Sequence, residues 1–150
     1  MLVKCSMRLV LLLAIVFLTR TLSLAQSEPI ETTLWYNEEK TAEIQVYKAT
    51  DGKLYGKIVW LKVPSIDGKP KIDIHNPDQA HRNDPIIGLV ILKGLKKGNT
   101  ENQYEDGTIY DPKNGKTYSC KITYKCDKLD VRGYLGFSLI GRTTTWTKAD

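Results

Sequence analysis

Short runs of alternating apolar and polar residues, separated by tight-turn signals, cover most of this chain. Residues 42–49 (AEIQVYKA) and 117–124 (TYSCKITY) both show a period of two, which is typical of a strand with one buried face. Asp51-Gly52 and Asn114-Gly115 are dipeptides that favour tight hairpin turns. No segment shows a sustained helical period. The pattern therefore predicts an all-β protein made of antiparallel neighbours.

The remaining strand-like runs bring the number of expected strands to that of a small β-barrel. One is 54–61, in which Leu54, Gly56, Ile58 and Trp60 fall on one face, and the others are the apolar run 86–92 and the segments 107–111, 129–137 and 141–148. Residues 93–103 are polar and are expected to be a connection. With a first strand near residue 35, we count about eight strands joined by short links. This predicts a single up-and-down antiparallel β-barrel.

Residues 62–85 interrupt this rhythm. The segment has four prolines, many Asp and Asn residues and little periodicity, so we expect a long loop with one helical turn after Pro77. A loop of this length in a compact domain is often functional.

The N-terminus has the features of a secretory signal peptide. Lys4 and Arg8 precede the apolar run 9–18, and the small residues Ser23 and Ala25 predict cleavage after Ala25. A transmembrane anchor is the competing interpretation, but it needs about 20 apolar residues. We therefore expect one exported domain, residues 26–150, that is periplasmic or secreted and has no membrane span after cleavage.

Cleavage also changes the charge balance. Residues 1–25 contain three basic residues and no acid, so the 22 Lys and Arg of the chain fall to 19 against 17 Asp and Glu. The remaining excess of positive charge is small, and export separates the protein from most nucleic acid. We expect no nucleic-acid partner.

Cys120 and Cys126 remain after cleavage. If both lay on one continuous strand, they would be about 20 Å apart, whereas bridged Cα atoms lie within about 7 Å. The five residues between them contain no Gly, Pro, Asn or Asp to form a turn, so two free thiols are expected.

Three segments resemble one bacterial family. They are 76–92 (NPDQAHRNDPIIGLVIL), 107–122 (GTIYDPKNGKTYSCKI) and 129–148 (LDVRGYLGFSLIGRTTTWTK), and they are similar to the exported family called domain of unknown function 2147 (DUF2147). The resemblance extends from about Trp35 to Lys148. It implies a lipocalin-like barrel and no established activity.

The resemblance also suggests how the barrel is closed. Barrels of this kind often have a Gly-x-Trp on the first strand, with an Arg from the last strand packed on the Trp. Here Thr33 occupies the Gly position, and Trp35 and Arg142 are the structural closure candidates. A stacked guanidinium would contribute about 0.5–2 kcal/mol. The alternative role of Arg142 is to clamp a ligand carboxylate.

Aromatic residues and one strand arginine are candidates for lining a pocket. Arg132 either faces solvent or points inward, where it would need an acid or an anionic ligand. An eight-stranded barrel either fills with side chains or holds one small ligand. The candidate ligand-binding residues are Trp60, Tyr118, Arg132, Tyr134 and Trp146.

The other polar motifs do not indicate catalysis. His75 and His81 match no zinc spacing, so no metal or other cofactor is expected. Asn76, Pro77 and Arg82 are candidate anchors that hold the long loop over the barrel mouth. Residues 136–141 (GFSLIG) lack the spacing of a nucleophile elbow, and Ser138 is expected in a hairpin.

Three functions follow from the sequence. The first is non-enzymatic binding or carriage of a small apolar or amphiphilic molecule, with an anionic head group as one option. The second is an envelope protein-interaction or stress module that uses loop 62–85 around a side-chain-filled barrel. A hydrolase is third, because it needs His75 or His81 beside a carboxylate or Ser in one cleft.

Overall fold

A computed structural model describes residues 29–149 except Ser138, so the predictions of a signal peptide, of its cleavage after Ala25 and of a hairpin at Ser138 lie outside the described residues. The elements are the 3₁₀ helices η1 (Ile30–Thr32) and η2 (Gln79–His81) and the strands β1 (Leu34–Tyr36), β2 (Ala42–Lys48), β3 (Leu54–Leu61), β4 (Ser65–Ile66), β5 (Lys69–Pro70), β6 (Val90–Lys97), β7 (Gln103–Asp111), β8 (Lys116–Lys125), β9 (Lys128–Tyr134) and β10 (Gly141–Lys148).

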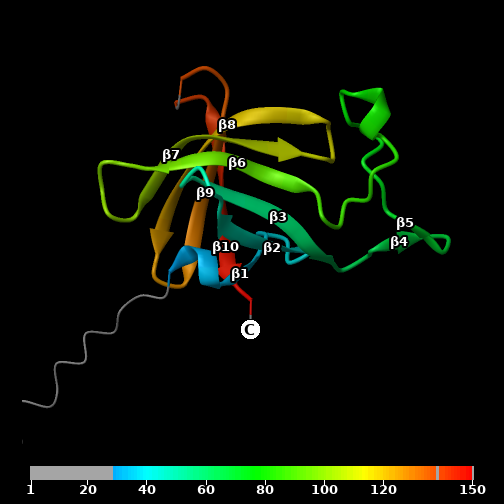
Figure 1. Cartoon of the computed structure of the whole chain (residues 1–150), viewed down its shortest axis with the longest axis horizontal. Helices are drawn as coiled ribbons and strands as arrows, with labels where there is room; N and C mark the ends of the chain where they lie inside the picture. Colours follow the sequence, from blue (N-terminus) through cyan, green and yellow to red (C-terminus); the bar gives the residue numbers. More distant parts are fainter. Residues whose placement is uncertain (1–28, 138, 150) are drawn as a thin grey trace, which may run out of the picture.

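Eight of these strands form a closed barrel in the order β1-β10-β9-β8-β7-β6-β3-β2, and every neighbouring pair is antiparallel (Figure 1). β1 closes the ring with a short contact, in which Trp35 and Tyr36 pair with Lys148 and Thr147. The predicted all-β, eight-stranded barrel is confirmed. Within the described residues, no helix is long and apolar enough to cross a membrane.

The bounds of β6 differ from the prediction. The strand begins at Val90 and continues through Lys97, so residues 93–97 are strand rather than connection. Leu92 and Leu95 are both buried although they are three residues apart. Gly94, with a φ of +73°, lies between them and breaks the alternation. A period of two therefore could not identify the second half of this strand.

A bulge also changes the predicted faces of β3. Ile44 pairs with Ile58 but Glu43 pairs with Trp60, so one extra residue, Val59, lies between the two pairs. The extra residue reverses the alternation beyond it. Trp60 is consequently 40% exposed on the outer wall, in edge contact with Tyr36 at 6.2 Å between ring centroids. The prediction that Trp60 lines the pocket is wrong.

One end of the barrel is filled by bulky side chains. Trp35 is buried there, donates its indole N–H to the Ile30 carbonyl at 3.1 Å and meets the Tyr124 ring edge-on at 5.9 Å. Leu129 and Ile122 are buried in the same core. This end is therefore closed by packing, and we call it the closed end.

Both described cysteines are free thiols, as predicted. Cys120 is fully buried on β8, and burial raises the pKa of its thiol to about 12. Cys126 is exposed in the β8–β9 turn, where its φ is +56°.

The segment between β3 and β6 projects from the barrel (Figure 1). It contains the β4–β5 hairpin, in which Ile66 pairs with Lys69, and the helical turn η2 at residues 79–81. The predicted long loop with a helical turn after Pro77 is confirmed, and the hairpin within it is an addition.

Candidate functional site

A cavity of about 1220 Å³ opens at the other end of the barrel. We call this end the mouth. It is formed by the β1–β2 turn (37–41), the β7–β8 turn (112–115), the β9–β10 turn (135–140) and the segment 62–89. The inner wall is largely apolar, and among its residues are Ala42, Ile44, Ile58, Leu61, Ile91, Ile109, Tyr110, Tyr118, Val131, Tyr134 and Trp146.

Small inward-facing residues explain why this half of the barrel is hollow. Gly133 on β9, Thr144 on β10 and Ala42 on β2 all line the cavity, whereas Trp35 and Leu129 fill the closed end. A Cβ at Gly133 would meet Ile109 at 3.4 Å, so a side chain there would extend into the open space without a clash. An eight-stranded barrel can hold one small ligand only where its interior is left unfilled in this way.

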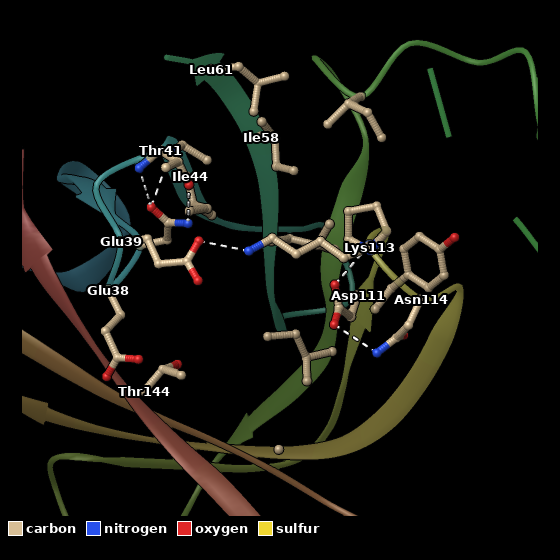
Figure 2. Close-up of a pocket in the computed structure, with 18 of the residues that line it drawn as sticks. Glu38, Glu39, Thr41, Ile44, Ile58, Leu61, Asp111, Lys113, Asn114 and Thr144 are labelled. Carbon is tan, nitrogen blue, oxygen red and sulfur yellow. Dashed lines mark hydrogen bonds and ion pairs between the residues drawn. The ribbon is translucent and has the colours of Figure 1, made fainter. Parts of the chain in front are cut away.

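Two ion pairs span the rim of the mouth. Lys113 Nζ lies 2.7 Å from Glu39 Oε2 and Arg142 Nη2 lies 2.9 Å from Glu38 Oε2. Figure 2 shows Lys113 extending across the opening to Glu39. The hydrogen bond from Lys113 lowers the pKa of Glu39. Because all four side chains are substantially exposed, these pairs add little stability, and their main effect is to make the rim polar.

Glu38 also helps to close the barrel on the mouth side of the short strand β1. β1 pairs with β10 only at Thr147 and Lys148, so the part of β10 from Gly141 to Trp146 has no strand partner on that side. The Glu38 carboxylate accepts a hydrogen bond from the Thr145 N–H at 3.4 Å while it pairs with Arg142. A side chain therefore bridges the seam where the backbone ladder ends.

A buried carboxylate attaches the long segment to the barrel. Asp73 is fully buried, and Tyr110 of β7 donates its hydroxyl to the two carboxylate oxygens, each 2.9 Å away. The Asn76 side-chain amide donates to Oδ2 of the same carboxylate at 2.8 Å. Burial, and then the hydrogen bond with Asp73, raise the pKa of Tyr110 to about 12. These three residues form the Asp73 anchor.

Asp73 and Tyr110 are not among the loop anchors predicted from the sequence, which are Asn76, Pro77 and Arg82. The available signal was an Asp between Ile72 and Ile74, in a short apolar run followed three residues later by Asn.

The predicted loop anchors make contacts within the segment. Arg82 Nε donates to the Asn76 carbonyl at 2.8 Å, and both Arg82 and Pro77 are exposed. Asn76 in addition contacts the buried Asp73. A role for Arg82 and Pro77 in holding the loop over the mouth stays a prediction.

The β7–β8 turn fits closely under this segment. Gly115 has a φ of +70°, and a Cβ there would lie 2.0 Å from the His75 carbonyl oxygen. Only glycine satisfies both the backbone conformation and the close approach. Asn114-Gly115, which the sequence predicts as a tight turn, is therefore also the place where the long segment packs on the β7–β8 turn.

Three of the five predicted lining residues do line the cavity. They are Tyr118, Tyr134 and Trp146. Arg132 does not, because Val131 and Gly133 on either side of it face inward and the alternation turns Arg132 outward. Its guanidinium donates to Thr143 Oγ1 at 3.1 Å and to the Leu139 carbonyl at 3.4 Å. The ligand-facing interpretation of Arg132 is wrong.

The predicted contact between Trp35 and Arg142 is also wrong. Trp35 pairs with Lys148, six residues along β10 from Arg142, which corresponds to roughly 20 Å at the rise of a strand. Trp35 lies at the closed end, where Ile30 and Tyr124 contact it. Arg142 lies at the mouth with Glu38, where it does line the cavity.

The two histidines are separated by the fold. His75 lines the cavity, whereas His81 lies outside its lining and is bonded through Nδ1 to Asp84 Oδ2 at 2.7 Å, which raises the pKa of His81. Among residues 29–149 without Ser138, no group of three or more His, Cys, Asp or Glu side chains could hold a metal ion.

Comparison with known proteins assigns the family. The family model described as "Uncharacterized protein conserved in bacteria (DUF2147)" matches residues 33–148. The chain belongs to this family. No curated protein matches it.

One solved structure shares the fold of this DUF2147 member. Its description is "Protein HP1028 from the human pathogen Helicobacter pylori belongs to the lipocalin family". The two chains are 23% identical and align with a TM-score of 0.67, over 81% of this chain and 85% of the other. The match confirms that this DUF2147 chain has a lipocalin-like barrel.

Proposed function

We propose that this protein is exported and binds one small apolar or amphiphilic molecule in the barrel, without catalysis. The observation that carries the proposal is the cavity of about 1220 Å³, which has a largely apolar wall and a polar rim at the mouth. Ligand sites in proteins are typically concave and mostly apolar, with a few placed polar groups. A lipocalin-like fold is consistent with such a site.

The arrangement favours an amphiphile with a defined orientation. Ile44, Ile58 and Val131 offer no polar atom deep in the cavity, so the apolar part of a ligand would lie there. Its polar end would lie at the rim, where Lys113 and Arg142 carry positive charge and already pair with Glu39 and Glu38. An anionic head group would compete with these two carboxylates for the same cations.

Export with cleavage after Ala25, to the periplasm or outside the cell, is part of the proposal and rests on the signal-like N-terminal sequence.

The alternative of a protein-interaction module around a filled barrel is less well supported, because the half of the barrel at the mouth is hollow. A hydrolase is disfavoured because His81 and its carboxylate partner Asp84 lie outside the cavity lining. His75 does line the cavity, but the described histidine–carboxylate contacts all involve His81.

Titration with the apolar fluorescent probe 1-N-phenylnaphthylamine tests the binding proposal. The wild-type protein is expected to increase the probe's fluorescence saturably. Gly133→Phe should weaken binding roughly tenfold or more, because the new ring fills part of the cavity. Urea unfolding of the variant verifies that it folds.

Ser119→Phe is the matched control. Ser119 lies on β8 next to Cys120, which pairs with Gly133, and it faces the opposite side of the sheet from the buried Cys120. The control should bind the probe like wild type. An unsaturable wild-type signal, or equal binding by Gly133→Phe, contradicts the proposal.

A further inference from the structure

The β9–β10 turn exposes a cluster of large apolar side chains. Phe137 is 82% exposed, Leu139 89% and Ile140 70%, and Leu135 precedes them. Residues 133–141 contain no acidic side chain. We call residues 135–137, 139 and 140 the tip. Soluble proteins seldom expose apolar residues in this density without a partner.

A second apolar and cationic element flanks the same opening. The arm, residues 62–74, exposes Val63, Ile66 and Ile74. It also carries three lysines, at positions 62, 69 and 71, against one exposed acid, Asp67, since Asp73 is buried. Residues from both the tip and the arm line the cavity, so the two elements border one mouth.

Positive charge also lies directly beneath the tip. Arg132 and Lys121 are opposite each other on β9 and β8, on the outer face of the sheet. Arg132 is bonded to the Leu139 carbonyl, which places a guanidinium against the base of the tip.

We propose that the mouth docks on an anionic lipid bilayer, with the tip and the arm in the interfacial region and the lysines and Arg132 at the level of the phosphates. Apolar side chains bordered by Lys and Arg have the composition that binds such interfaces. In this orientation the cavity opens toward the acyl chains, so an amphiphile can pass between bilayer and barrel. The transfer of an amphiphile between bilayer and barrel rests on the proposed function, whereas docking on the bilayer does not.

Flotation with phospholipid vesicles tests the docking. Wild-type protein should float with vesicles that contain phosphatidylglycerol and phosphatidylcholine, and much less with phosphatidylcholine alone. Added salt should release it, because the contact is partly electrostatic. Phe137→Asp combined with Leu139→Asp should weaken binding roughly tenfold or more, since both changes put charge into the interface.

Ile87→Asp is the control, because Ile87 is 41% exposed but belongs to neither the tip nor the arm and does not line the cavity. It should float like wild type. Equal flotation with both lipid mixtures, no flotation at all, or unchanged flotation of the tip variant each overturn the docking proposal. A tip that binds a protein partner instead would give the second result.

The two proposals fail separately. The tip variant is expected to lose vesicle binding and to keep binding 1-N-phenylnaphthylamine, whereas Gly133→Phe should do the opposite. Loss of both activities in the tip variant, when urea unfolding shows that it is folded, would contradict separate roles for tip and cavity. Probe binding without any vesicle binding overturns docking alone.

Discussion

Asp73→Ala is expected to lower the free energy of unfolding by about 3 kcal/mol, measured by urea denaturation. The carboxylate is fully buried and accepts hydrogen bonds from Tyr110 and Asn76, so its removal leaves both donors unsatisfied. Hydrogen exchange should in addition rise across residues 62–89, because the anchor is the polar attachment of this segment to β7.

Tyr110→Phe tests the same anchor from its other side. In a double-mutant cycle the two substitutions should be strongly non-additive, because both break one contact. The pKa of Tyr110 is raised from its ordinary 10.0 to about 12, so the stabilisation is complete below pH 10 and is lost as pH rises toward 12. Tyr110→Phe should remove the part of the loss of stability at alkaline pH that comes from ionisation of Tyr110. Additive effects would contradict the anchor.

Trp35→Ala is expected to cost about 3–5 kcal/mol of unfolding free energy, because it empties the packed closed end and removes the hydrogen bond to Ile30. Arg142→Ala should cost less than about 1 kcal/mol, because its ion pair with Glu38 is exposed. Urea unfolding of both variants separates this structure from one in which Arg142 caps Trp35. Comparable large losses for both would favour the capped arrangement.

Much of the barrel is predictable because its determinants are local. Period-two alternation in β8 places Cys120 and Ile122 in the core, and the same period places Arg142, Thr144 and Trp146 of β10 in the cavity lining. The Asp-Gly and Asn-Gly turns give Gly52 and Gly115 positive φ. Each of these features depends on residues that are close in sequence.

The failures occur where one residue shifts a register or where contacts are distant in sequence. The extra Val59 moves Trp60 to the outer wall, and no local pattern marks the position of that bulge. Arg132 could be inside or outside until the register of β9 was known. The Asp73–Tyr110 and Glu39–Lys113 contacts join residues far apart in the chain, so periodicity carries no information about them.

Native mass spectrometry on residues 26–150, purified from the periplasm without unfolding, tests the central claim most directly. The same protein after denaturation and delipidation is the reference, and Gly133→Phe is the cavity control. We predict a reproducible extra mass that delipidation removes and that Gly133→Phe does not carry. A bound mass that Gly133→Phe retains in full, or an unliganded wild type that also fails to bind the fluorescent probe, would contradict a ligand in the barrel.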